Sequence, residues 1–554
     1  MRRLAAMLAG TAFFIVLSAT IAVGQLPFRY VSLGNSPDDI NGRDVGRAGD
    51  VNNDGFADYI VGIPGDDTNG LNAGSAAVYS GVDGTLLHTF FGVSANDQFG
   101  TAVDAAGDVN NDGFDDVIVG AFLDDDAGMD AGSVTVFSGL DGSILYKIDG
   151  TVASDNFGIS VCGLGDINND SHDDFAVGAW LADAPSVDSG AARVFSGIDG
   201  SPFFTFLGDG PGDQLGTSIA NAGDVNNDGI NDIIIGAVLD DDGGFNSGMA
   251  RVYSGGDGGV LYTKHGSGAI DLFGLSVDGC GDVNNDGFDD FIVGAMLDDN
   301  NGADSGSATV YSGQDGTVIY VFDGAAAGDN LGYSVAGVGD VNDDGVPDFA
   351  CGAPAASVNG TKSGSALFYN GNNGSIIQAF HGFVAGDEMG TAIAGIGDCN
   401  NDGFSDALIS APFQDLNGIN SGLTFVISIG GARSYGGTGN PFYTLTAEWI
   451  PDGVPGGADG ILKCSGAVPG AAGLAAVSLA PANTLIFGGF PLLIAADAFN
   501  LQASEPFGFD FFGEVATQHT LQSSFTAGVL FYVQYFSNSP VPAASNGVEV
   551  LVVK

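Results

Sequence analysis

The chain has 554 residues, a formal net charge of −55 and only 13 Lys and Arg side chains, a composition that excludes several classes of protein. Nucleic acid and anionic membrane surfaces are unsuitable partners, because both would be repelled by so acidic a protein. Disorder is excluded as well, because 45% of the residues are hydrophobic and a chain without a core would carry far fewer. The 92 glycines favour short strands joined by tight turns.

Residues 1–24 are typical of a secretory signal peptide. Arg2 and Arg3 precede an apolar run from Leu4 to Val23, and small residues around Gly24 suit a cleavage site. An uncleaved membrane anchor is the alternative, because about twenty apolar residues can span a bilayer. No later stretch is long and apolar enough to do so. We therefore expect a secreted, extracellular or cell-surface protein without a transmembrane span in the mature chain, compatible with association with a cell envelope.

The middle of the chain is a repeat array. Nine-residue runs rich in side-chain oxygens, such as Asp108–Asp116, occur seven times between Asp50 and Asp406, and their first residues are always 58 positions apart. Such a period indicates copies of one supersecondary unit. In the second copy, turn signals separate four strand-like segments, at residues 101–106, 117–121, 133–137 and 143–148. Each unit is therefore predicted to be a sheet of four antiparallel strands.

The two ends of the array complement each other. Residues 28–33 align with the fourth strand of a unit, whereas the seventh unit ends near residue 434 without a convincing fourth strand. Pairing the N-terminal strand into the last unit would close a ring and hide two sheet edges. The sequence thus predicts an all-β fold with a seven-bladed β-propeller over residues 28–434. An open solenoid is the alternative, but it would require polar caps at both ends.

Strand order also predicts which loops share a face. Connections between antiparallel strands alternate between the two ends of a blade, so the acidic run and the Ser-Gly-x-Asp-Gly turn between strands three and four lie on one face. The opposite face carries the loops between strands two and three, with acidic stretches at 124–126 and 240–242. It also carries the crossovers between blades, which contain Asp97, Asp155, Asp213, Asp271, Asp329 and Asp387.

The repeat stops near residue 434. Residues 435–441 are rich in glycine, which is typical of a linker. Residues 442–554 are apolar and poor in charge, with alternating segments at 520–524, 529–535 and 547–553, and predict a small domain resembling a β-sandwich. The five cysteines are odd in number and lie at unrelated positions of the repeat, so we expect buried thiols, with a Cys399–Cys464 disulfide as the alternative.

The acidic runs have the composition of calcium-binding loops. Ca²⁺ takes six or more oxygen ligands, and such a loop can offer side chains at positions 1, 3, 5 and 9 and the carbonyl near position 7. An all-oxygen set disfavours zinc and copper. An EF-hand would need a glutamate at position 12, where the second copy has Val119. The alternative is that the side chains form metal-free Asx turns.

We predict up to seven Ca²⁺ sites, one in each copy. The third copy has Ser171 where the others have glycine, which predicts weaker binding there. The predicted side-chain ligands are Asp50, Asn52, Asp54, Asp58, Asp108, Asn110, Asp112, Asp116, Asp166, Asn168, Asp170, Asp174, Asp224, Asn226, Asp228, Asp232, Asp282, Asn284, Asp286, Asp290, Asp340, Asn342, Asp344, Asp348, Asp398, Asn400, Asp402 and Asp406.

The motifs around these runs resemble the FG-GAP repeats of the integrin α-chain propeller. Phe99-Gly100 and Phe273-Gly274 precede two of the runs, and Gly352-Ala-Pro354 follows another, whereas the fourth copy has Leu215-Gly216. The resemblance implies a calcium-stabilised propeller that binds extracellular partners on the face opposite the calcium loops. The C-terminal part is also similar to small domains that end secreted, repeat-bearing bacterial proteins.

Two functions are compatible with the sequence. The first is a secreted, non-catalytic binding, adhesion or structural module whose ligand is an unidentified extracellular protein or glycan. No nucleophile elbow, zinc-binding helix or phosphate-cradling loop is present, so no catalytic residue is predicted. The second is a calcium-dependent polysaccharide lyase or glycoside hydrolase that uses carboxylates of the 124–126 or 240–242 loops. Scarcity of Lys and Arg disfavours it, because a lyase needs cationic groups to hold a uronate.

Overall fold

A computed structural model of the protein describes residues 28–429 continuously. Outside that range it describes only strands: β1 (Phe14–Ser18), β30 (Thr444–Pro451), β31 (Gly460–Ser465), β32 (Leu479–Ala480), β33 (Thr484–Phe487), β34 (Phe490–Leu492), β35 (Thr520–Ser524) and β36 (Leu530–Gln534). The part of the chain that is described contains no helix of the length and hydropathy needed to cross a bilayer. The chain divides into two compact units, and Leu26–Gly431 is one of them.

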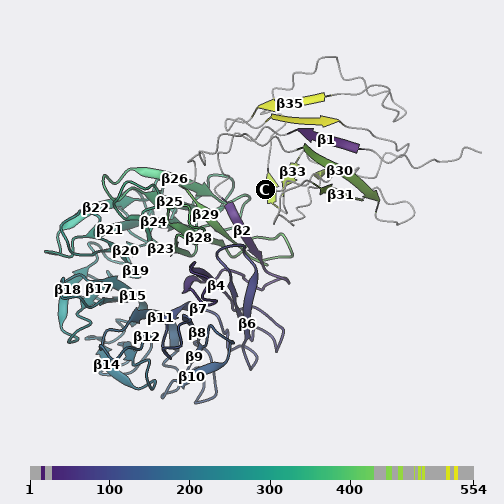
Figure 1. The fold of residues 1–554 in the computed structure, drawn as a ribbon. Helices are drawn as coiled ribbons and strands as arrows, with labels where there is room; N and C mark the ends of the chain where they lie inside the picture. The colour runs from purple at the N-terminus through teal and green to yellow at the C-terminus, as the bar shows by residue number, and fades with distance from the viewer. Residues whose placement is uncertain are drawn as a thin grey trace, which may run out of the picture. The chain divides into compact units, whose positions relative to one another are not determined.

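Residues 28–429 form seven four-stranded antiparallel sheets arranged as the blades of a propeller (Figure 1). Blades 1 to 3 consist of β3 (Val45–Gly49), β4 (Asp58–Ile63), β5 (Ser75–Tyr79), β6 (Leu86–Phe91), β7 (Ala102–Gly107), β8 (Asp116–Ala121), β9 (Ser133–Phe137), β10 (Ile144–Asp149), β11 (Phe157–Gly165), β12 (Asp174–Ala179), β13 (Ala191–Phe195) and β14 (Pro202–Leu207). Blades 4 to 6 consist of β15 (Leu215–Gly223), β16 (Asp232–Ala237), β17 (Met249–Tyr253), β18 (Val260–His265), β19 (Phe273–Gly281), β20 (Asp290–Ala295), β21 (Ser307–Tyr311), β22 (Val318–Asp323), β23 (Ser334–Gly339), β24 (Asp348–Ala353), β25 (Ser365–Tyr369) and β26 (Ile376–His381).

Blade 7 closes the ring with strands from both ends of the array. It consists of β27 (Ile393–Gly397), β28 (Asp406–Ala411), β29 (Leu423–Ser428) and, as its outer strand, β2 (Phe28–Leu33). Leu33 pairs with Leu423, and Val31 pairs with Phe425. The predicted closure by the N-terminal strand is thus confirmed, and an open solenoid is excluded.

Burial follows the position of each strand in its blade. The second strand is buried at every residue, as in Asp116–Ala121, because it lies between neighbouring strands and between neighbouring blades. The fourth strand is mostly exposed or half-buried, as in Ile144–Asp149, which suits an outer edge. The cores lie between blades: Ile118 and Val134 of blade 2 belong to the same cluster as Phe175 of blade 3.

The first strands surround a central cavity of about 680 Å³. Charged side chains line it, among them Arg47, Asp104 and Asp278. Burial raises the pKa of Asp278 to about 7, against the effects of its backbone hydrogen bond from Gly337 and the nearby Arg47 charge, which lower it. The centre of the ring is therefore polar, and the apolar core lies between the blades.

The four strands expected in blade 2 are confirmed to within one residue at each end. Four of the cysteines, Cys162, Cys280, Cys351 and Cys399, are free and buried, as expected. β1 pairs with β30 and β35 with β36. The linker at 435–441 and the alternating segment at 547–553 lie outside the described residues. The signal peptide and the β-sandwich-like domain at 442–554 stay predictions.

Candidate metal centre

Each acidic run forms the loop between the first and second strands of a blade. In blade 2 this loop connects β7 with β8. At its end, the backbone amide of Gly139, in the turn between β9 and β10, donates a hydrogen bond to Oδ1 of Asp116 at 3.0 Å. The same bond recurs in blades 1, 3, 4, 5 and 6. The acidic loop and the Ser-Gly-x-Asp-Gly turn therefore share one face, as predicted.

The first aspartate of each run holds the loop together. The two carboxylate oxygens of Asp108 accept hydrogen bonds from the backbone amides of Asp112 and Gly113, each at 2.9 Å. The equivalent pair of bonds is present in the other six runs. Gly113 has a φ of 88°, a conformation that glycine adopts at little cost. Ser171 takes this place in the third run with a φ of 73°.

The ninth residue of each run is a fully buried aspartate. Besides the bond from Gly139, Asp116 accepts a hydrogen bond at Oδ2 from the backbone amide of Val109, at 3.1 Å. Burial, together with the carboxylates of Asp112 and Asp108, raises the pKa of Asp116 to about 7. The same shift to about 7 occurs at Asp58, Asp174, Asp232, Asp290 and Asp348. Each loop thus carries three aspartates, and in blades 1 to 6 a cation would offset the carboxylate repulsion that acts on the ninth residue.

Oxygen atoms without hydrogen-bond partners lie in three of the loops. Oδ1 of Asn52 and Oδ1 of Asn110, at the third position, are buried and accept no hydrogen bond, and neither does Oδ1 of Asp406. Leaving a buried acceptor unpaired costs about 1–3 kcal/mol. A hard cation satisfies such an oxygen directly, and Ca²⁺ binds carboxylate and amide oxygens. The residues of the loops in blades 1 and 2 therefore fit the predicted ion, whereas in blade 7 the predicted ligand Asp402 already forms an ion pair with Arg29 at 3.0 Å.

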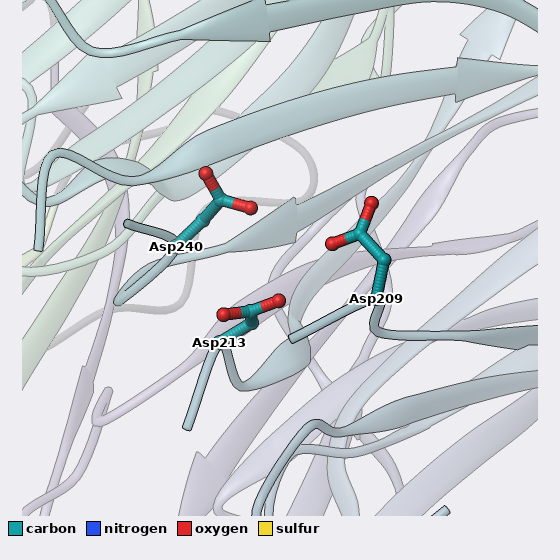
Figure 2. Close-up of side chains that lie close together, drawn as sticks. All are labelled: Asp209, Asp213 and Asp240. Atoms are coloured by element: carbon teal, nitrogen blue, oxygen red, sulfur yellow. The ribbon is translucent and has the colours of Figure 1, made fainter. Parts of the chain in front are cut away.

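The tightest group of carboxylates lies elsewhere. Within the described residues, the one set of three or more His, Cys, Asp or Glu side chains whose ligand atoms all lie within 4.8 Å of one another is Asp209, Asp213 and Asp240 (Figure 2). The seven predicted ligand sets are not drawn together to this degree. The sequence predicts Asp213 and Asp240 on the face opposite the acidic loops, whereas Asp209 was not predicted there. The signal for Asp209 was its spacing, four residues before the regularly placed Asp213.

This trio has contacts of its own within the protein. Arg251 forms an ion pair with Asp209 at 2.9 Å, and Nδ1 of His265 lies 3.3 Å from Oδ1 of Asp240. Burial raises the pKa of Asp213 to about 6, and the carboxylates of Asp240 and Asp209 add to this effect. Arg251 thus already balances part of the charge of the trio. The trio is an acidic cluster that links a crossover to the loop following β16.

The aspartates of the acidic stretch at 124–126 also form contacts within their own blade. Nζ of Lys147 lies 2.6 Å from Asp126 and 3.3 Å from Asp124. The hydroxyl of Ser133 donates a hydrogen bond to Asp124 at 2.6 Å. A catalytic carboxylate has to face its substrate, whereas these two hold β9 and β10 to the loop. The contacts do not favour the glycan-cleaving alternative.

A family model described as FG-GAP repeat matches residues 273–311 and 331–374, which include the acidic runs of blades 5 and 6. The chain contains FG-GAP repeats within its seven-bladed propeller and is similar to integrin α-chains. Integrin alpha-5 of Xenopus laevis is 32% identical to it over 214 residues, which cover 36% of this chain and 20% of that protein. Integrin alpha-V of Gallus gallus is 29% identical over 215 residues, which cover 37% of this chain and 20% of that protein. This chain therefore spans about a fifth of the length of these curated relatives.

Proposed function

We propose that this FG-GAP protein is a secreted, calcium-binding propeller that acts as a non-catalytic binding or adhesion module. The observation that carries the proposal is the construction of the acidic loops, in which a buried aspartate with a raised pKa and buried unpaired oxygens occur at ligand positions. The buried aspartate recurs once in each of the seven blades, whereas the unpaired oxygens lie in the loops of blades 1, 2 and 7. Repetition in every blade supports a structural role for the ion and assigns no reaction to it.

The side chains at positions 1, 3, 5 and 9 of each run, which are the 28 residues predicted from the sequence, would hold the ion. A bound divalent cation supplies positive charge that keeps the three carboxylates ionised in a compact loop. Through Asp116 it would also steady the turn at Gly139, because that turn is bonded to the same carboxylate. Calcium that binds the folded state alone stabilises that state.

The face opposite the calcium loops is the proposed ligand face. Its loops vary from blade to blade, as with the three consecutive aspartates at 124–126 and the Asn300-Asn301 pair in blade 5. The similarity to integrin α-chains supports an extracellular protein or glycan as partner, and supports a secreted or cell-surface location. Net charge argues against nucleic acid.

The proposed function is tested on the full mature chain. Arrays of extracellular matrix proteins and of glycans are probed with it, once in calcium and once with a chelator. We expect capture by a restricted class of ligand, lost or weakened on chelation, because loss of the ion loosens the blades. The same glycans are then assayed for reducing ends and unsaturated products. Release of either product would contradict the non-catalytic proposal, and absence of any capture would contradict the binding role.

A further inference from the structure

Exposed apolar side chains recur at one position of the face opposite the calcium loops. They lie at the tip of the loop between the second and third strands of a blade. We name them the apolar arc and define it as Leu71, Met129, Val187, Phe245 and Ile419. Each is 63–67% exposed to solvent, and successive members of the first four are 58 positions apart. Regular repetition distinguishes them from the scattered exposed apolar residues of ordinary surfaces.

The arc runs over consecutive blades of the ring. Its residues belong to blades 7, 1, 2, 3 and 4, which are consecutive neighbours in the closed propeller. Blades 5 and 6 carry Ala303 and Thr361 at the equivalent position. Because every tip occupies the same place in its blade, the five side chains follow a curved path on one face, and the path ends where the small and polar residues begin.

Hydrogen bonds fix each tip in place. The backbone amide that follows Leu71 donates to Oδ1 of Asp67 at 2.7 Å. The carbonyl oxygen of Leu71 accepts a bond from Asn96, in the crossover to the next blade, at 2.8 Å. Corresponding pairs of bonds hold Met129, Val187, Phe245 and Ile419. The backbone of the arc is thus ordered before any partner arrives, which reduces the entropic cost of binding.

Negative charge accompanies every residue of the arc. An exposed aspartate stands four residues before each tip, at Asp67, Asp125, Asp183, Asp241 and Asp415. In blade 6, outside the arc, this position is Ser357, and Lys362 follows the polar tip. Apolar and acidic groups therefore alternate along the arc. This pattern complements a surface on which apolar and basic side chains alternate, whereas anionic lipids or a second copy of this acidic chain would be repelled.

We propose that the apolar arc docks a basic protein surface, inserting its five fixed side chains between the lysine and arginine residues of the partner. This inference rests on the proposed binding function and names the chemistry of its partner. Burial of apolar area at the tips supplies affinity. The flanking aspartates make the binding specific for a basic partner and make the affinity depend on ionic strength.

The test uses the full mature chain and three short synthetic peptides, one of alternating Lys and Leu, one of alternating Lys and Ser, and one of alternating Glu and Leu. Binding is followed by fluorescence anisotropy in calcium at two salt concentrations. We expect the Lys-Leu peptide to bind at least about tenfold more tightly than the Lys-Ser peptide. We also expect the Glu-Leu peptide not to bind, and raised salt to weaken the complex.

A variant with serine at all five arc positions is compared with a matched control. The control carries serine at five other apolar residues, which begin outer strands and are 52–60% exposed: Leu86, Ile144, Val260, Val318 and Ile376. Loss of about tenfold or more in affinity for the arc variant alone supports the proposal. Equal losses in both variants, or none in the arc variant, overturn it. So does binding through the arc to anionic vesicles or to a second copy.

Thermal melting with and without calcium, measured on the same proteins, separates this inference from the proposed function. An arc that fails the peptide test in a protein stabilised by calcium overturns the docking proposal alone. An arc that passes in a protein indifferent to calcium leaves docking intact and overturns the role of the ion.

Discussion

The backbone amide of Gly139 donates a hydrogen bond of 3.0 Å to Oδ1 of Asp116, a residue 23 positions earlier in the chain. This contact joins the acidic loop of blade 2 to the turn between its two outer strands. Because Asp116 also accepts the amide of Val109, a single buried carboxylate organises both connections on that face. The stability of a blade and the shape of its acidic loop therefore depend on the same side chain.

Replacing Asp116 with alanine should destabilise the propeller strongly. Both hydrogen bonds are lost and two buried backbone donors are left unpaired, each of which costs about 1–3 kcal/mol. Chemical unfolding in calcium measures the loss. Asp141→Ala is the control, because Asp141 lies exposed in the turn of the same blade. Similar unfolding midpoints for the two variants would contradict the role assigned to Asp116.

Position 6 of the acidic run is serine in the third copy and glycine in the second, so the two residues can be exchanged at equivalent positions. Ser171 adopts a φ of 73°, and a left-handed conformation costs a non-glycine residue about 1–2 kcal/mol. Ser171→Gly should therefore stabilise the protein by up to about 1 kcal/mol. The reverse change, Gly113→Ser, should destabilise it by a similar amount. Unfolding free energies of both variants test this, and effects of the same sign would contradict it.

Ring closure by β2 predicts unequal effects for two equivalent substitutions. Val31 in β2 and Thr89 in β6 occupy the same position of the outer strand. Proline at either site removes a backbone donor and disturbs the strand. Val31→Pro should lower the melting temperature more than Thr89→Pro, because it also frees the edge that closes the ring. Equal shifts would show that closure adds nothing.

Asp278, which lines the central cavity, leads us to expect a pH dependence of stability. Its pKa is raised to about 7 in the folded protein, above its value of about 3.9 in an unfolded chain. Between these two pKa values Asp278 is more protonated in the folded state than in the unfolded state. The free energy of unfolding therefore falls as pH rises from about 4 to about 7, by up to about 1.4 kcal/mol per pH unit, and the contribution of Asp278 to stability is lost. Arg47 and Asp104 are the charged groups that act on it.

Asp278→Asn removes this titration. Urea unfolding without calcium, at several pH values between acid and neutral, should show a smaller loss of stability in the variant than in the unaltered protein. Asp141→Asn, at an exposed turn, serves as the control. A steeper loss in Asp278→Asn would contradict the raised pKa.

Much of the fold followed from sequence periodicity. The interval between Asp50 and its copies predicted seven blades, and the phase of residues 28–33 predicted the strand that closes the ring. Both predictions were correct because each blade repeats the same local pattern of strands and turns. The shared face of acidic loops and turns followed from antiparallel order alone.

Features produced by contacts between neighbouring loops could not be predicted in this way. Asp209 joins Asp213 and Asp240 through the packing of a crossover against a loop, and its position four residues before Asp213 is a mark that does not by itself predict this contact. The apolar arc was equally hidden. Leu71 and Phe245 are apolar residues that composition would place in the core, and only the bonds that hold their backbones explain why their side chains stay outside.

The central claim, that calcium occupies the acidic loops and stabilises the propeller, is tested most directly by calorimetric melting of the full mature chain at rising calcium concentration and after chelation. We predict a melting temperature that rises with calcium and falls on chelation, because an ion that binds only the folded state shifts the unfolding equilibrium. Asp108→Asn with Asp112→Asn should reduce the response, and Asp141→Asn should not. A melting temperature unchanged by both calcium and chelator would contradict the account.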